Sequence, residues 1–283
     1  VVCIAALFVV SCAHPNGSAP TTVGSAWTLR WSDEFDGARG AGADAKSWSH
    51  DSGDGCAAGN CGWGNNEKEH YAEGAPNASL TGSGELAIVA RVADSGLSCY
   101  YGPCRYTSAK IKTQGKIQVT HGRVEARIRL PRGQGLWPAF WLLGSNIGPT
   151  PWPACGELDI MENHGSNVAQ ISSAIHGPGY SGGTTPFVHG TTRPDGSFAD
   201  AFHVFAVEWD SSRIIFSVDN TPHYVVTKDE VRKHGEWPFD QPFFIILNLA
   251  VGGNFDGDPK SDAIFPATML VDWVRVYERA NNR

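Results

Sequence analysis

Apolar and polar residues alternate along several short segments, which is the pattern of β-strands with one buried face. In residues 86–92 the apolar residues Leu86, Ile88, Ala90 and Val92 would share one face of a strand. In residues 123–130 the apolar positions 124, 126, 128 and 130 alternate with Arg123, Glu125, Arg127 and Arg129. Because successive side chains of a strand point to opposite faces, we predict strands in both segments, with the charged residues facing away from the core.

The second half of the chain predicts more strands and almost no helix. Residues 205–209 (FAVEW) and 214–218 (IIFSV) are apolar runs separated by the turn residues DSS, which together predict a β-meander. A short helix is expected only around residues 228–233, and no repeat of 20 to 50 residues is evident. The pattern therefore predicts an all-β domain but leaves sandwich, barrel and jelly roll open.

Length and composition favour one large β-domain that binds an uncharged polymer. The chain has 283 residues, 33 Gly, 17 Pro and 10 Trp, and its formal net charge is −7. Many Gly and Pro suit short strands joined by tight turns. A nucleic-acid partner is excluded on charge, because such surfaces need Lys and Arg to neutralise phosphate. Tryptophan faces suit a neutral carbohydrate better.

The first 26 residues are predicted to be an export leader and a linker. Residues 1–12 begin with an apolar run too short to span a bilayer, as in the h-region of a signal peptide. The run ends in VVSC, which resembles a lipobox with Cys12 as the lipidated residue, although a cut after Ala13 would release a soluble secreted form. Residues 13–26 are expected to be a flexible linker and residues 27–283 a single domain.

Five cysteines follow the predicted leader. Cys56 with Cys61 and Cys99 with Cys104 each enclose four residues in Gly-rich segments, so local disulfides are the first choice among the three pairings. A zinc site is the alternative, but matching histidines are missing from the spacing. Cys155 is left over and is expected to be a buried thiol.

Residues 157–162 (ELDIME) bring three carboxylates into one apolar strand. On a regular strand Glu162 would point away from Glu157 and Asp159, but one extra residue in a β-bulge would return it to their face. Two nearby carboxylates suit glycoside hydrolysis, where one attacks or stabilises the anomeric carbon and the other protonates the leaving oxygen. The alternatives are a charged exposed strand or a calcium loop.

The blocks around this strand extend the argument over most of the chain. They include WSDEFDG at 31–37, GWGNNE at 62–67, YTSAKI at 106–111, GLWPAFWLLG at 135–144, HGPGYSGG at 176–183, LNLAVGG at 247–253 and VDWVRVY at 271–277. In these blocks the chain resembles glycoside hydrolase family 16, in its laminarinase (endo-β-1,3-glucanase) branch. The resemblance covers roughly residues 27–278. It implies a concanavalin-like β-jelly roll with the active site in a cleft on the concave sheet.

The resemblance also implies roles for the acids. Glu157 is expected to be the nucleophile, Glu162 the general acid and then base, and Asp159 the assisting carboxylate between them. Their mutual repulsion should raise one pKa and hold a proton on Glu162. The implied reaction is endo-acting hydrolysis of laminarin-type glucan with retention of configuration, which needs the two glutamates about 5–5.5 Å apart.

Subsite and metal candidates follow from the same blocks. The expected substrate-binding residues are Trp137, Trp141, Trp152, His176, Asn66 and Glu67, with Trp63 and Trp237 as further platforms. Each tryptophan has the alternative of packing in the core. Glu34 and Asp272 match segments that hold a structural calcium in relatives, and salt bridging is the alternative. Catalysis itself should need no cofactor.

Two alternatives to laminarin hydrolysis stay open at this stage. The same acids would serve a mixed-linkage β-1,3-1,4-glucanase or an agarase-like enzyme, and a glucan-binding protein without activity would share the fold. The chain departs from the family pattern at Lys110, where Arg is common, and at residues 68–70 (KEH), where a more neutral pair is common. These departures affect subsite detail. A monomer is expected.

Overall fold

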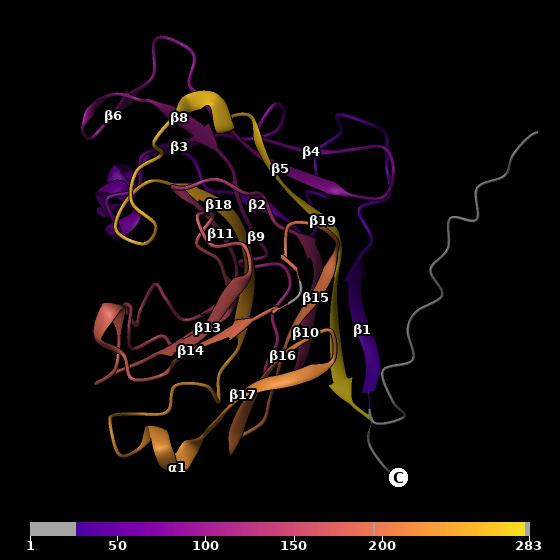
Figure 1. Cartoon of the computed structure of the whole chain (residues 1–283). Coiled ribbons are helices and arrows are strands. Elements are labelled where there is room, and N and C mark those ends of the chain that lie inside the picture. Colours follow the sequence, from indigo (N-terminus) through magenta and orange to yellow (C-terminus); the bar gives the residue numbers. More distant parts are fainter. Residues whose placement is uncertain (1–26, 195, 281–283) are drawn as a thin grey trace, which may run out of the picture.

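Two large sheets form the protein, and their inner faces share one apolar core (Figure 1). The computed structural model describes residues 27–194 and 196–280. The predicted signal peptide, the linker and Cys12 lie outside these described residues. The predicted β-sandwich is therefore confirmed as two sheets closed over a common core.

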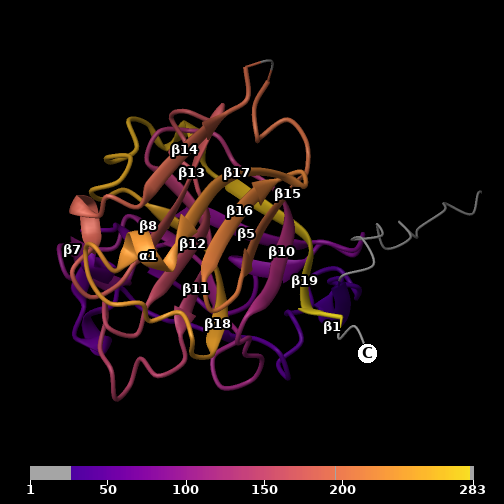
Figure 2. The ribbon, with the colours of Figure 1, turned by 90° about the horizontal axis from the view of Figure 1, so that it is seen from below.

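The first sheet has ten strands, all antiparallel except the β3–β8 pair. Along the sheet the order is β17 (Thr221–Thr227), β16 (Arg213–Val218), β15 (His203–Trp209), β10 (Gly122–Arg129), β19 (Ala267–Arg279), β5 (Leu86–Val92), β8 (Tyr106–Ser108) and β3 (Glu69–Tyr71), with β1 (Trp27–Asp33) on β19 and β4 (Ala78–Leu80) on β5. Figure 2 shows β16, β15 and β10 running side by side. The predicted strands at 86–92 and 123–130 and the predicted meander are all present.

The second sheet has seven antiparallel strands and carries the candidate acids. Its order is β14 (Val188–Thr192), β13 (Gln170–His176), β12 (Glu157–Glu162), β11 (Leu136–Gly144), β18 (Phe243–Val251), β9 (Lys110–Lys112) and β2 (Ser49–His50). The strand β18 is buried along its whole length. It pairs with β11 on one side and with β9 on the other, although more than 130 residues separate β9 and β18 in the chain.

The remaining elements are short. They are a hairpin of β6 (Ser98–Cys99) and β7 (Gly102–Pro103), the helix α1 (Lys228–Val231), and 3₁₀ turns at Cys56–Ala58, Cys61–Gly64, Gly182–Thr184 and Asp262–Ile264. The predicted helix at 228–233 is thus confirmed but shorter. Thr227 begins it with a capping box, in which Thr227 and Glu230 each bond the other's backbone N–H. Within the described part of the chain, no helix is long and apolar enough to cross a bilayer.

One predicted face differs from expectation. Arg123 and Glu125 of β10 point away from the core, as predicted, yet each is only 3% exposed. Arg123 donates to Glu125 at 2.8 Å and to Glu208 at 2.5 Å, and these bonds satisfy charges that would otherwise be costly to bury. The alternation predicted the direction of these side chains but not the ion pairs that cover them.

Both local disulfides are confirmed. Cys56 is bonded to Cys61 and Cys99 to Cys104. His70 Nδ1 lies 3.9 Å from Cys104 Sγ, so the fold supplies the histidine that the spacing lacked, but both neighbouring thiols are used in the disulfide. Cys155 is buried and free, as expected.

Candidate active site

The bulge in β12 gathers the three acids on one face of the seven-stranded sheet, which we name the acid face. Asp159 pairs with Trp141 of β11, and Glu162 pairs with Ala139, so three steps along β12 match two along β11. The same shift appears against β13. The Ile-Met pair between the two acids is buried entirely in the core. Both apolar side chains thus point inward, and Glu162 returns to the face of Glu157, as predicted.

Burial is the main electrostatic influence on the acids. It raises the pKa of Asp159 to about 8, and burial together with the charge of Asp159 raises the pKa of Glu162 to about 8. Burial and then Asp159 also raise the pKa of Glu157 well above its usual value, while His176 and Lys110 oppose this rise. Burial, and not the predicted mutual repulsion, is the larger cause, and it raises the pKa of all three acids. The cluster therefore carries fewer than three charges at neutral pH.

His176 lies directly against the acids. Its Nε2 is 3.2 Å from Asp159 Oδ2 and 3.7 Å from Glu157 Oε1, and its side chain is 12% exposed. These three side chains are close enough together to ligate a metal ion. The same arrangement also suits an acid pair whose negative charge is balanced by an imidazole. His176 thus lies within the acid cluster, and its substrate-binding role stays a prediction.

Trp137 and Trp141 reach the acid face from β11, each half-buried. The indole N–H of Trp137 donates to Glu162 Oε1 at 3.1 Å. The indole N–H of Trp141 donates to Asn248 Oδ1 at 2.7 Å. Both rings are thus held beside the acids, on the side away from the core, which favours the platform interpretation over core packing.

The other tryptophans differ in placement. Trp152 is 44% exposed, and its ring centroid lies 6.1 Å from that of His176. Trp63 packs beside Tyr71 with ring centroids 5.3 Å apart. Trp237 donates to Asp240 at 3.2 Å, and its ring centroid lies 5.5 Å from Nζ of Lys228 in α1. Trp152 and Trp63 therefore border the acid face, whereas Trp237 is tied to the α1 region.

Glu67 has a less direct place than the sequence suggested. It is 5% exposed; its Oε1 accepts from Asn65 at 3.0 Å and its Oε2 accepts from the Tyr71 hydroxyl at 3.3 Å. The Tyr71 hydroxyl in turn accepts from Asn248 Nδ2 at 3.1 Å. Because Asn248 also holds Trp141, Glu67 supports this platform from below rather than facing a substrate.

Asn66, the other predicted residue of this segment, lies at the surface. Its side chain donates to Asn254 Oδ1 at 2.9 Å and its φ is +58°. Asn tolerates this left-handed conformation better than most residues. Asn66 therefore links its segment to the loop after β18 and stays accessible for a polar contact with a substrate.

Lys110, a departure from the family pattern, lies between two aromatic rings. Its Nζ is 4.5 Å from the centroid of Trp63 and 5.1 Å from that of Trp141. It also pairs with Asp51 Oδ2 at 3.5 Å. A lysine here therefore provides a positive charge on the acid face and cation–π contacts to two platforms.

The metal candidates are each engaged by an arginine. Glu34 accepts two bonds from Arg275, at 3.0 and 2.8 Å. Asp272 accepts from Arg127. These side chains realise the salt-bridge alternative, and neither offers the uncommitted carboxylate that Ca²⁺ prefers.

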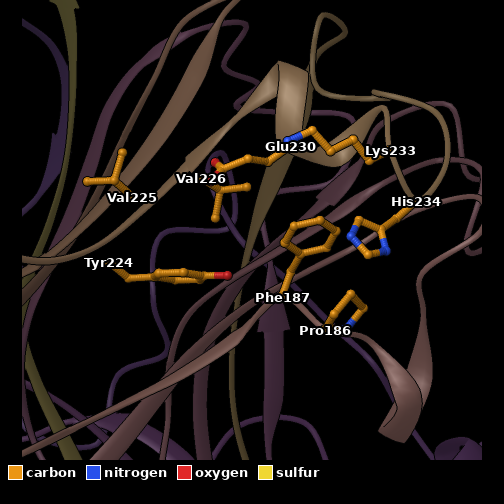
Figure 3. A pocket seen from close by; sticks show the side chains of 8 residues that line it. All are labelled: Pro186, Phe187, Tyr224, Val225, Val226, Glu230, Lys233 and His234. Atoms are coloured by element: carbon orange, nitrogen blue, oxygen red, sulfur yellow. The ribbon is translucent and has the colours of Figure 1, made fainter.

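A separate pocket of about 300 Å³ lies away from the acids. Figure 3 shows Tyr224, Phe187 and His234 around it, and none of the three acids lines it. It lies at β17 and α1, at the end of the molecule where Trp237 is found. The candidate chemistry therefore belongs to the acid face and not to this pocket.

Three residues of the site were missed by the sequence reasoning. Asn248 is the single polar residue in the apolar run FFIILNLAV, and that isolation was a usable signal. Phe255 and Asp256 lie in a polar loop, and no local pattern distinguishes them. Their contacts with Trp137 and with the segment after Glu162 appear only in the fold.

An all-β sandwich whose bulged strand collects three partly buried carboxylates between tryptophans defines a glycoside hydrolase of the two-carboxylate type. Carboxyl groups placed in this way can supply a proton donor and a nucleophile, and flat apolar rings match the faces of sugar rings.

Comparison with known proteins places the chain more narrowly. The model of the glycosyl hydrolases family 16 matches residues 66–275. A β-glucanase of Rhodothermus marinus is 38% identical over 260 residues, which cover 89% of this chain and 85% of that protein. The laminarinase catalytic domain of Thermotoga maritima is 42% identical with a TM-score of 0.84, covering 90% of this chain and 100% of that one. The endo-β-1,3-glucanase of Pyrococcus furiosus is 45% identical with a TM-score of 0.84, covering 90% and 95%.

The chain belongs to glycosyl hydrolase family 16, and its sandwich is the predicted β-jelly roll.

Proposed function

We propose that this protein is an endo-acting β-1,3-glucanase that cleaves laminarin-type glucans. The observation that carries the proposal is the bulge, which aligns Glu157, Asp159 and Glu162 on one face beside Trp137 and Trp141. Similarity to a laminarinase and to an endo-β-1,3-glucanase over nine-tenths of the chain supports the choice of polymer. The three acids count against a glucan-binding protein without activity.

The proposed reaction is a double displacement with retention. Glu157 attacks the anomeric carbon as Glu162 gives its proton to the leaving glycosidic oxygen, so that a glycosyl–enzyme ester forms and the bond to the leaving sugar breaks. Glu162, now ionised, takes a proton from water, whose oxygen attacks the same carbon and releases Glu157. The raised pKa of Glu162, about 8, keeps it protonated near neutral pH.

Asp159 and the cations assist these steps. Asp159 lies between the two glutamates and beside His176, whose Nε2 is 3.2 Å away. A carboxyl group there can share a proton with its neighbours as charge moves from Glu157 to the ester and back. His176 and Lys110 both lower the pKa of Glu157, which favours the ionised nucleophile.

We also propose export from the cell and action as a monomer on glucan. Two disulfides support an oxidising compartment. A lipid anchor at Cys12 and a cut after Ala13 give proteins of different mass, so mass spectrometry of the mature N-terminus in the producing cell distinguishes them. An intact, unprocessed leader would contradict export.

The proposal is tested on three polymers side by side: laminarin, barley β-glucan and agarose. We expect laminarin to yield a ladder of oligosaccharides and to be hydrolysed fastest. Faster hydrolysis of barley β-glucan would assign the mixed-linkage activity, and faster hydrolysis of agarose the agarase-like one. Binding of laminarin by folded protein without any hydrolysis would contradict the enzymatic proposal.

A further inference from the structure

The loop of residues 252–258, which follows β18, is bonded to the segment that continues from Glu162. Asp256 is central to it, with a side chain only 5% exposed. Its Oδ2 accepts from the backbone N–H of Gly135 at 2.9 Å and from that of Ser166 at 3.0 Å. Its Oδ1 accepts from the Ser166 hydroxyl and lies 3.5 Å from His164 Nδ1. One carboxylate thus joins the segment entering β11 to the segment leaving β12.

Backbone contacts make the same junction tight. Gly133 N–H donates to Gly165 O at 3.0 Å, and Gly165 N–H donates to Leu136 O at 2.8 Å. A Cβ on Gly165 would lie 2.2 Å from Gly133 O, so no side chain fits there. The backbone three residues after Glu162 therefore has little freedom to shift while the Asp256 bonds are present.

Phe255 continues the junction into the site. Its ring stacks between His164 and Trp137, with centroid distances of 3.9 and 4.4 Å and interplanar angles of 20° and 14°. The indole N–H of Trp137 donates to Glu162 Oε1 at 3.1 Å. The plane of the Phe255 ring thus sets the plane of the indole that holds the carboxyl group.

We propose that Phe255 and Asp256 are positioning residues for the general acid. Asp256 fixes the backbone that follows Glu162, and Phe255 fixes the Trp137 indole that orients the Glu162 carboxyl group. The inference rests on the role proposed above for Glu162. Proton transfer depends steeply on the distance and alignment of the donor, so loosening either support should slow the step that needs this proton.

The test compares kcat/KM on laminarin and on 2,4-dinitrophenyl β-laminaribioside. Dinitrophenolate leaves without a proton, and kcat/KM reports the steps up to formation of the glycosyl–enzyme. We expect Phe255→Leu and Asp256→Asn each to lower kcat/KM on laminarin by about 10- to 100-fold. On the aryl glycoside the change should stay within about twofold, because Glu157 and the Trp141 platform are unaltered and this leaving group needs no proton.

Two further variants serve as controls. Phe255→Tyr keeps the stacked ring and should retain the laminarin rate. Asp210 accepts the same kinds of bond within the turn between β15 and β16, from Ser212 N–H at 2.8 Å and from the Ser212 hydroxyl at 2.5 Å. Asp210→Asn should therefore change kcat/KM by the same factor on both substrates, because it acts only through stability.

Equal losses on both substrates, or no loss on laminarin, would overturn the inference. If Asp256→Asn fails to fold, Phe255→Leu decides. Glu162→Ala is measured on the same two substrates as the reference. If Glu162→Ala lowers kcat/KM equally on both substrates, Glu162 is not the general acid. The role proposed for Glu162 and the inference that rests on it then both fail. If Glu162→Ala slows only laminarin while the Phe255 and Asp256 variants do not, the inference alone fails.

Discussion

At the scale of residues, the acid face combines acids that are difficult to ionise with cations that favour their ionisation. Burial raises the pKa of Glu157, Asp159 and Glu162, and His176 and Lys110 oppose this rise at Glu157. His176 lowers the pKa of Glu162 as well, so Lys110 is the cation that acts on Glu157 and not on Glu162.

Replacing either glutamate should abolish most turnover. We expect Glu162→Gln to lower kcat on laminarin by about 10²- to 10⁴-fold, because Gln cannot give a proton. Glu157→Gln should cost at least as much, since the covalent intermediate is lost. Binding of laminari-oligosaccharides, measured by calorimetry, should be largely retained. Glu85→Gln, at the turn before β5, is the matched control, and near-normal turnover in either active-site variant would refute the assignment.

Lys110 should affect the pH profile. Lys110→Met removes a charge that lowers the pKa of Glu157, so that pKa should rise further and Glu157 should ionise only at higher pH. We therefore expect the acidic limb of kcat/KM on laminarin to move to higher pH. Lys110→Arg keeps the charge and should leave the limb in place. An acidic limb that does not move in Lys110→Met would contradict this role.

At the scale of elements, single strands connect distant parts of the site. The strand β3 begins at Glu69, two residues after the buried Glu67, and Glu69 Oε2 accepts from Val251 N–H at 2.7 Å. Burial and then Glu67 raise the pKa of Glu69 well above its usual value. These two buried carboxyl groups thus begin a chain of hydrogen bonds that runs from Glu67 through Tyr71 and Asn248 to Trp141.

Glu69→Gln should stabilise the protein at high pH. A carboxyl group whose pKa is raised by folding contributes its full stability below the unfolded value of about 4.3 and loses it as pH rises through the folded value. Gln can bond both Val251 N–H and Glu67 without a proton. We expect a higher Tm than wild type at pH 8 and little difference at pH 4. Glu69→Ala, which loses the acceptor for Val251 N–H, should be less stable than wild type at both pH values. A Glu69→Gln variant destabilised equally at pH 4 and pH 8 would refute the predicted effect of the buried carboxyl pair.

At the scale of the whole molecule, two sheets packed over one apolar core carry the stability, and the disulfides add to it locally. Cys56–Cys61 and Cys99–Cys104 each join residues five apart in the sequence. Closed loops of this size restrict the unfolded chain more than they alter the folded one. Their effect should therefore appear in unfolding and not in the chemistry of the acid face.

Removing one disulfide should lower stability by a modest amount. For Cys56→Ser with Cys61→Ser we expect the free energy of unfolding to fall by about 2 kcal/mol in urea titration, from the entropy of a short loop. The laminarin rate at 25 °C should be unchanged. Reductant should lower the Tm of wild type more than that of the double variant, which has one disulfide left. Equal Tm values for oxidised and reduced wild type would contradict the estimate.

The local pattern was enough to predict the strands and the disulfides, and it showed that only a bulge would place the three acids together. Alternation at 86–92 follows from the two faces of a strand, and the ELDIME run required a bulge to place Glu162 with Glu157. Sequence-near pairs such as Cys56 and Cys61 were likewise predictable. The burial of Arg123 and Glu125 could not be predicted, because Glu208, the second partner of Arg123, lies on another strand.

What only the tertiary structure decided was which distant residues meet the acids. Lys110 reaches Trp141 because β9 pairs with β18, and Asp256 reaches Ser166 because the loop after β18 lies against the end of β12. A strand's own residues determine which side chains share a face, since that depends on backbone geometry alone. The order of strands in the sheet determines which faces and loops become neighbours, and that order depends on how the whole core packs.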